Sequence, residues 1–165
     1  MKIATVSLNQ IWEDKKTNID LCEKFIRESS NKSADVVIFP EMTLTGFSPG
    51  NILLIENIYN SHTLEWFGKL ANKYSINIIF GACLQEKGKS LPFNMLCIAD
   101  KKGAVIPLYA KTHLFTHANE DQYLIPGDKV VTYKIGDMVF GLAICYDLRF
   151  PELFSTMASS CDAII

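Results

Sequence analysis

The fold of this chain is decided by residues 140–152, which read FGLAICYDLRFPE. Residues 138–144 are an apolar run of strand length, and Pro151 suits the first turn of a helix because its missing N–H would be unpaired there anyway. Cys145 is therefore expected between a strand and a helix. A thiol facing helix-start amides feels positive potential, which predicts a lowered pKa and a reactive thiolate. A buried structural cysteine is the alternative, because free cysteines are among the most buried residues.

The first half of the chain alternates between two hydrophobic periods. Apolar runs predict strands over residues 3–8, 36–39 and 76–84. Apolar residues at helical spacing predict helices near residues 17–28 and 64–74. The run at 36–39 is continuous, which is typical of a strand in a sheet covered by helices. This β-α-β-α-β order predicts an α/β fold.

From residue 86 onward the pattern changes to shorter strands separated by turn signals. Residues 94–99 and 105–109 are expected to form an antiparallel meander around the turn at residues 100–103. Residues 112–127 lack periodicity and contain Pro126-Gly127, which predicts a long loop. Loops of that length inside compact domains are commonly functional.

The C-terminal segment predicts a further strand. Residues 130–135 and 138–144 are expected to form a hairpin, followed by a helix over residues 151–160. Residues 162–165 then have the pattern of a strand, which the crossover helix would place parallel to residues 138–144. The sequence stops inside this apolar run. We therefore expect residues 1–165 to be the N-terminal part of one domain that is truncated at its C-terminus.

The composition excludes several classes of protein. A length of 165 residues with 48% hydrophobic content suits one globular domain, and a formal net charge of −2 leaves no electrostatic footprint for nucleic acid or anionic membrane. No apolar run has the length of a membrane span or a signal peptide. The five cysteines contain no C-x-x-C pair, so neither a disulfide framework nor a zinc ribbon is expected. These features predict a cytoplasmic protein with no nucleic-acid or membrane partner.

Three residues with reactive side chains directly follow predicted strands: Glu41, Lys111 and Cys145. In α/β sheets, such side chains converge at the strand ends. A thiol nucleophile needs a base, which Glu41 would supply, and Lys111 with the backbone N–H after Cys145 would stabilise an oxyanion. Taken alone, Glu41 and Lys111 fit a solvated loop carboxylate and a surface lysine more simply.

Three motifs resemble those of one known family. FPEMTLTGF (residues 39–47) is similar to the glutamate motif of the nitrilase superfamily of carbon–nitrogen hydrolases. YAKTHLF (residues 109–115) is similar to its lysine motif, and ICYDLRFPE (residues 144–152) to its cysteine motif. The motifs occur in the family's order, and Asn94 and Glu120 stand where the family usually has an asparagine and a second glutamate. The resemblance covers the whole chain.

The resemblance implies a four-layer α-β-β-α sandwich and a Glu41–Lys111–Cys145 catalytic triad. Glu120 would support the triad by accepting a hydrogen bond from Lys111, and the backbone N–H of Tyr146 would join the oxyanion site. The implied reaction hydrolyses a small-molecule amide through a Cys145 thioester, with release of ammonia or an amine. No metal or organic cofactor is implied, and the full-length form is expected to be a homodimer.

The residues after the cysteine indicate a branch of this family. True nitrilases usually have Trp-Glu there, whereas this chain has Tyr146-Asp147, which favours an amidase. Residues 146–152 resemble the omega-amidase and Nit-like branch, whose members hydrolyse monoamides of small dicarboxylates. Arg149 is a candidate for binding a substrate carboxylate, with a structural ion pair as the alternative. Family members continue past residue 165, so part of the pocket wall and dimer surface would lie beyond this sequence.

Two other functions remain open. His113 and His117 have the i, i+4 spacing of a zinc site on a helix, but no glutamate directly follows His113 and the segment lacks helical periodicity. The second alternative is a non-catalytic binding or regulatory module that retains the hydrolase fold. Thiol-dependent release of ammonia would exclude that module.

Overall fold

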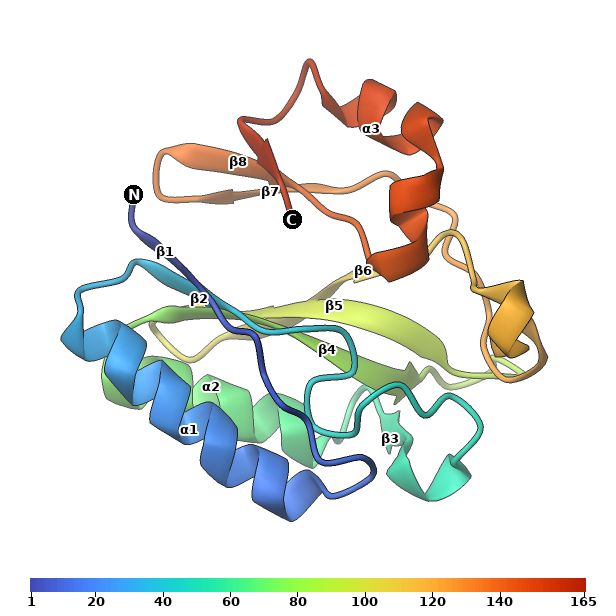
Figure 1. Cartoon of the computed structure of the whole chain (residues 1–165), viewed down its shortest axis with the longest axis horizontal. Helices are drawn as coiled ribbons and strands as arrows, with labels where there is room; N and C mark the ends of the chain where they lie inside the picture. The colour runs from blue at the N-terminus through green and yellow to red at the C-terminus, as the bar shows by residue number, and fades with distance from the viewer.

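The computed structural model describes all 165 residues and contains two β-sheets (Figure 1). The larger sheet begins with three parallel strands, β1 (Ile3–Thr5), β2 (Val36–Ile38) and β4 (Asn77–Gln85). Helix α1 (Lys15–Asn31) connects the first two strands, and α2 (His62–Tyr74) precedes the third. The predicted β-α-β-α-β order is therefore confirmed.

Two antiparallel strands complete the path of the larger sheet. β5 (Phe93–Ala99) pairs with β4, and β6 (Val105–Ala110) pairs with β5, so the predicted meander is confirmed. The register between β5 and β6 shifts at Leu96 and Cys97, where Pro107 faces the ladder. Proline has no N–H to donate, so it is confined to such irregular or outer positions.

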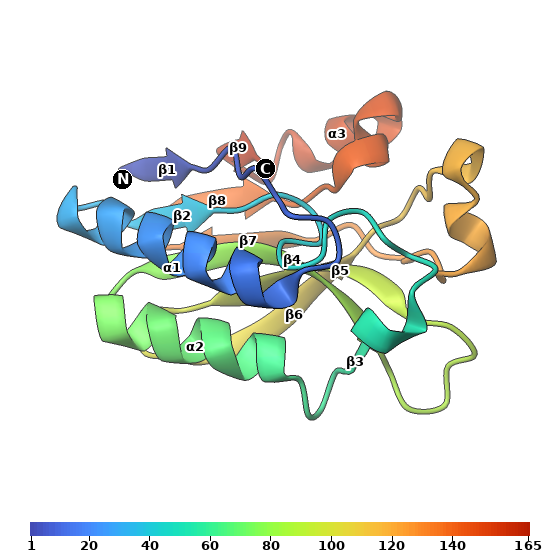
Figure 2. The same cartoon turned by 60° about the horizontal axis from the view of Figure 1, so that its bottom comes forward.

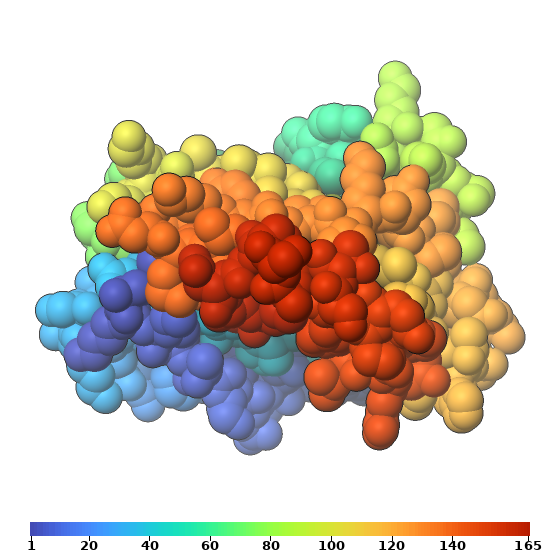
Figure 3. Space-filling view, turned by 90° about the horizontal axis from the view of Figure 1, so that it is seen from above, coloured from blue at the N-terminus to red at the C-terminus, as the bar shows by residue number.

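The smaller sheet contains β7 (Thr132–Ile135), β8 (Met138–Gly141) and β9 (Ala163–Ile164). β7 and β8 form the predicted hairpin, and α3 (Pro151–Met157) leads to β9. β9 is parallel to β8, so the pairing predicted for residues 162–165 is confirmed. Figure 3 shows these C-terminal elements across one face of the molecule, beside the N-terminal segment.

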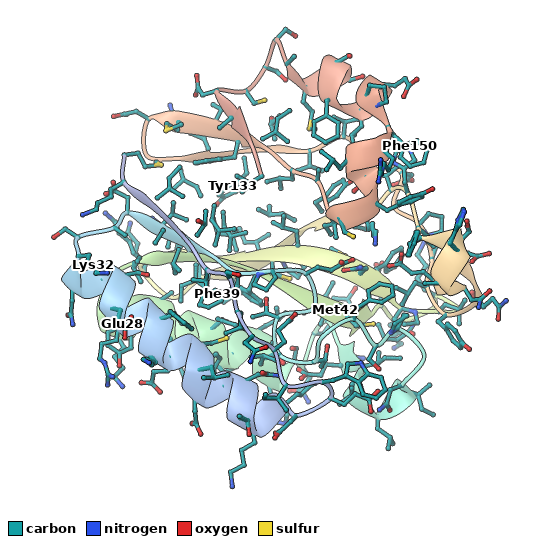
Figure 4. The ribbon with its side chains drawn as sticks, in the orientation of Figure 1. Glu28, Lys32, Phe39, Met42, Tyr133 and Phe150 are labelled. Atoms are coloured by element: carbon teal, nitrogen blue, oxygen red, sulfur yellow. The ribbon has the colours of Figure 1, made fainter.

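The elements form four layers, with α1 and α2 outside the larger sheet and α3 beyond the smaller one (Figures 1 and 2). One core of 17 buried residues lies between the helices and the larger sheet, where the rings of Phe67 and Phe80 stack at 3.8 Å. A second core of 9 buried residues, including Leu96 and Phe140, lies between the sheets. Tyr133 packs at the edge of this second core (Figure 4). The α/β class and the α-β-β-α layering are as expected.

Side-chain caps determine where the two long helices begin. Asp14 accepts the Thr17 N–H at the start of α1, which therefore begins earlier than residue 17. Ser61 accepts the Leu64 N–H at the start of α2, and Ser75 ends this helix in the left-handed conformation. None of the helices combines the length and the apolar character that a membrane span requires.

Several boundaries differ from the sequence predictions. The strand expected over residues 3–8 ends at Thr5, because the chain then leaves the sheet to contact the loop after β2. The long loop over residues 112–127 contains two 3-10 turns, η2 (Thr116–Ala118) and η3 (Glu120–Gln122). A further turn η1 (Ile52–Leu54) and strand β3 (Glu56–Asn57) have no clear sequence pattern. The last helix ends at Met157, before the predicted boundary at residue 160.

Candidate active site

Three segments that are distant in the sequence meet beyond the strand ends. Glu41 follows β2, Lys111 follows β6 and Cys145 lies past β8. Lys111 Nζ donates to Glu41 Oε1 at 2.8 Å, and Glu41 and Cys145 line the same cavity of about 110 Å³. The structure therefore brings together all three residues that the motifs singled out.

Lys111 is the buried centre of this site. Its side chain is 0% exposed, and Nζ also donates to both carboxylate oxygens of Glu120, at 3.2 and 2.9 Å. Burial by itself lowers the pKa of Lys111, but the charges and hydrogen bonds of Glu41 and Glu120 outweigh it and raise the pKa above its ordinary value. Lys111 is therefore held as an ammonium ion, and it is not the surface lysine of the simpler interpretation.

Asn94 and Glu120 brace this ion pair. Asn94 Nδ2 donates to Glu41 Oε1 at 2.6 Å and to Glu120 Oε1 at 3.1 Å. Glu120, also 0% exposed, accepts the Phe115 N–H on Oε2 at 2.6 Å. Asn94 Oδ1 is buried without a partner, which is uncommon for a buried polar atom. Asn94 and Glu120 thus fix the position of the lysine and of one oxygen of Glu41.

The loop that carries Glu41 is held in a strained conformation. Gln10 Nε2 donates to the carbonyls of Glu41, Met42 and Thr43, and Met42 has a φ of 44°. A Cβ on Gly81 would lie 2.4 Å from the Met42 nitrogen, so only glycine in β4 lets the loop approach this closely. Both donors to the Glu41 side chain bind Oε1, which leaves Oε2 without a partner in the chain.

Cys145 begins the 3-10 turn η4 (Cys145–Arg149), and α3 starts at Pro151, two residues after the end of this turn. It is exposed and has a φ of 47°, whereas Cys22, Cys83 and Cys97 are buried. The alternative of a buried structural cysteine is therefore wrong for Cys145. Its backbone lies in a region that non-glycine residues rarely adopt and that often marks functional sites.

The predicted lowering of the Cys145 pKa is wrong. Partial burial raises the pKa of the thiol, and the nearby negative charge of Glu41 raises it further, while Lys111 acts in the opposite direction. Desolvation and a neighbouring carboxylate both disfavour a thiolate. These two effects outweigh the charge of Lys111, which lowers the pKa of the thiol.

Two other predicted residues, Tyr146 and Arg149, lie in the same turn. The Asp147 N–H donates to the carbonyl of Ile144, just before the turn, and the Phe150 N–H to that of Asp147, whereas the Tyr146 N–H has no acceptor in the chain. This N–H is free to bind an oxyanion. Arg149 is exposed and forms no ion pair with a carboxylate, so the structure lends no support to its alternative role in a structural ion pair.

Asp147 is a site residue that sequence reasoning missed. Its side chain is 0% exposed, and it accepts hydrogen bonds from the turn itself and from Tyr109 and His113, which flank Lys111. The available signal is its place three residues after Ile144, the residue that caps the turn, where acidic side chains often bond back to the backbone. The motif drew attention to Asp147 only as a marker of the family branch.

The two histidines of the zinc alternative do not share a helix face. His113 binds Asp147 through Nδ1 and stacks on Phe150 with 3.7 Å between ring centroids. His117 lies in η2, exposed, with its ring parallel to that of Phe115. No group of three or more His, Cys, Asp or Glu residues has an arrangement that would hold a metal ion. The geometry gives this alternative no support.

Comparisons with known proteins agree with the three motifs. The family model for carbon-nitrogen hydrolase matches residues 2–164. The 2-oxoglutaramate amidase of Bacillus subtilis is 34% identical over 135 residues, which cover 82% of this chain and 51% of that protein. The omega-amidase NIT3 of Saccharomyces cerevisiae is 29% identical over 168 residues, which cover 93% of this chain and 57% of that protein.

A solved structure shows the same fold. The crystal structure of Saccharomyces cerevisiae Nit3, a member of branch 10 of the nitrilase superfamily, matches with a TM-score of 0.85 and 27% identity. The match covers 99% of this chain and 62% of that one. The chain therefore spans about half to three fifths of the length of these relatives.

Proposed function

Because this chain belongs to the carbon–nitrogen hydrolase family, we propose that the protein hydrolyses the amide bond of a small molecule at Glu41, Lys111 and Cys145. The observation that carries this proposal is a buried ammonium ion shared by two carboxylates, one of which borders a cavity together with an accessible thiol. A nucleophile, a base and an oxyanion donor are thus all present.

The first step is attack of Cys145 on the amide carbonyl carbon. Since its pKa is raised, the thiol is protonated at neutral pH and needs a base. Glu41 Oε2 is the oxygen that takes this proton, because Oε1 already accepts from Lys111 and Asn94. The C–S bond forms as the carbonyl π electrons move to oxygen, which gives a tetrahedral oxyanion.

Two donors stabilise this oxyanion. Lys111 Nζ supplies a fixed positive charge, which its carboxylate partners maintain, and the Tyr146 N–H supplies a neutral donor that makes no other bond. Fixed donors in a partly desolvated site stabilise developing charge without reorganising during the reaction. A buried ammonium ion is useful in such a site for this reason.

Collapse of the intermediate breaks the C–N bond. Protonated Glu41 gives its proton to the leaving nitrogen, ammonia or an amine departs, and the acyl group remains on Cys145 as a thioester. Water then attacks the thioester while Glu41 takes a proton from it. The second tetrahedral intermediate releases the carboxylic acid, and the proton on Glu41 returns to the Cys145 sulfur.

We propose that the substrate is a monoamide of a small dicarboxylic acid. The names of the Bacillus subtilis and yeast relatives support this class, and Arg149 is exposed, unpaired and four residues from the nucleophile. A guanidinium binds a carboxylate through two parallel hydrogen bonds. Arg149→Met should therefore raise KM for the monoamide but leave KM unchanged for an uncharged amide of the same length.

We further propose that the protein works in the cytoplasm as a homodimer, with no nucleic-acid or membrane partner. Five free cysteines support a reducing compartment. The dimer is proposed from the family resemblance. Size-exclusion chromatography with light scattering tests it, and a monomeric mass at micromolar concentration would contradict it.

The activity is tested by measuring ammonia release from dicarboxylate monoamides by the protein without substitutions, called the parent below, and by its Cys145→Ala variant. Cys161→Ala is a matched control, since Cys161 is also partly exposed and lies outside the cavity of Cys145. We expect Cys145→Ala to abolish release and Cys161→Ala to retain it. Binding of the monoamide without any release of ammonia by the parent would favour the non-catalytic module instead.

A further inference from the structure

The Asp147 carboxylate accepts four hydrogen bonds without any lysine or arginine partner. Oδ1 accepts the backbone N–H of His113 at 2.9 Å and lies 2.8 Å from His113 Nδ1. Oδ2 accepts the hydroxyl of Tyr109 at 2.7 Å and the backbone N–H of Ile144 at 2.9 Å. The side chain is 0% exposed, so these bonds replace its hydration entirely.

These bonds join two segments that are far apart in the sequence. Tyr109 and His113 lie on either side of Lys111, the proposed oxyanion donor. Ile144 directly precedes Cys145, and Asp147 belongs to the same turn. One buried carboxylate therefore connects the lysine segment to the cysteine turn.

Further contacts reinforce this connection from both sides. The Tyr109 hydroxyl also contacts Thr112 Oγ1 at 2.8 Å, and the ring of His113 stacks on Phe150 at an interplanar angle of 9°. Phe150 in turn donates its N–H to the Asp147 carbonyl and lies just before α3 (Figure 4). The hydrogen bonds of Asp147 and the stack of His113 on Phe150 thus hold the lysine segment and the cysteine turn together, and we call this set of contacts the Asp147 clamp.

We propose that Asp147 is a positioning residue, whose carboxylate holds the Cys145 turn at a fixed place relative to Lys111 and Glu41. The turn needs such a clamp because Cys145 has a positive φ, a conformation that persists only where surrounding contacts impose it. Without the four bonds the turn would relax toward a commoner backbone conformation. This inference rests on the proposed hydrolase function and assigns Asp147 no contact with the substrate.

The test compares Asp147→Asn with Glu56→Gln. The asparagine side chain keeps the size of aspartate, but its Nδ2 atom cannot accept from Tyr109 and Ile144. Glu56 is a matched control because it too is a shielded carboxylate with several hydrogen bonds, but it lies in β3 and binds Lys15 and the start of α2, away from Cys145. Tyr109→Phe is a milder second variant that removes one bond of the clamp.

Two measurements are made on each variant. The first is kcat and KM for ammonia release from a dicarboxylate monoamide. The second is the pH–rate profile for alkylation of Cys145 by iodoacetamide, with peptide mapping. In the same experiment the buried Cys22, Cys83 and Cys97 report unfolding, because they react only when the core opens.

We expect Asp147→Asn to lower kcat by about 10²-fold with a smaller change in KM, because a displacement of about 1 Å can cost that much. Its Cys145 alkylation midpoint should move down toward that of an ordinary thiol, since the turn would leave the neighbourhood of Glu41. Tyr109→Phe should show the same changes more weakly, and Glu56→Gln should show neither. The core cysteines should stay unreactive in all variants.

A folded Asp147→Asn protein with parental kcat and an unchanged alkylation profile would overturn the inference. If Asp147→Asn fails to fold, Tyr109→Phe decides by the same criteria. If the parent releases no ammonia from any monoamide, the proposed function fails, but the alkylation profile still decides whether Asp147 positions Cys145.

Discussion

Two lysine–glutamate clusters of this protein differ in which atoms they leave unpaired. In the first, Glu56 joins α1 to the start of α2. It accepts hydrogen bonds from Lys15, from the Ser61 hydroxyl and from both the N–H and the hydroxyl of Thr63. Every acceptor oxygen is used, and the backbone of a helix start is among the donors. This cluster therefore acts as a structural clamp.

The second cluster, around Lys111, has a similar composition but an open side. Lys111 binds Glu41 and Glu120, while Glu41 Oε2 and Asn94 Oδ1 have no partner. Cys145 lies beside it with a positive φ. Buried charge alone does not separate a functional cluster from a structural one. A buried unpaired atom such as Asn94 Oδ1 and the strained backbone of Cys145 distinguish the second cluster, because each costs free energy that a purely structural cluster would avoid.

Among substitutions in the two clusters, the largest effect expected is that of Lys111→Met. Loss of an oxyanion donor should lower ammonia release by about 10²–10³-fold. The buried carboxylate of Glu120 and the half-buried carboxylate of Glu41 would also lose their counter-ion, which should lower the free energy of unfolding by about 3–5 kcal/mol. Kinetics and urea denaturation measure the two effects. If Lys111→Met is stable and nearly as active as the parent, the second cluster has no catalytic role and does not differ from the first in function.

Asn94→Leu should lower kcat by about 10–100-fold, because a hydrogen bond to a charged group contributes about 1.5–3 kcal/mol. Asn94 binds the oxygens of both Glu41 and Glu120, so its loss frees Glu41 to rotate. Steady-state kinetics on the purified variant measure this change. An unchanged kcat would show that Lys111 alone is enough to orient the base.

Glu56→Gln should lower the free energy of unfolding by about 1–3 kcal/mol at pH 7 and leave ammonia release unchanged. Burial raises the pKa of Glu56, but hydrogen bonds from Lys15, Ser61 and Thr63 dominate and lower it from 4.5 to about 2. The stabilisation is therefore present above the unfolded pKa and is lost as pH falls from about 4.5 to about 2. Denaturation of parent and variant at pH 7 and at pH 3 measures the difference, which should shrink in acid.

The smallest effect expected is on the titration of Cys145. The rate of Cys145 alkylation by iodoacetamide should rise with pH with a midpoint above the pKa of an ordinary thiol. Glu41→Gln should lower this midpoint pH by removing a negative charge. Glu56→Gln serves as the control and should leave the midpoint unchanged. If the midpoint pH in the parent lies below the pKa of an ordinary thiol, the lowered Cys145 pKa predicted from its position at a helix start is correct after all.

Much of the architecture follows from local patterns. Hydrophobic period distinguishes strands from helices, and a strand–helix–strand unit is almost always parallel, which explains the correct pairing of residues 162–165. The same patterns placed Glu41, Lys111 and Cys145 at strand ends. The short elements η1, β3, η2 and η3 were missed because they depend on contacts with other segments and carry no periodic signal.

The periodicity of the sequence determined the order of elements, and its three motifs, through their resemblance to one family, indicated the layering and the three residues that meet at one end of the sheet. Tertiary structure alone decided the direction of the Cys145 pKa shift, the free oxygen of Glu41 and the linking role of Asp147. The reason is physical. Periodicity and capping act between neighbours in the chain, whereas desolvation and charge act through space, between residues that only the complete fold brings within a few ångströms of one another.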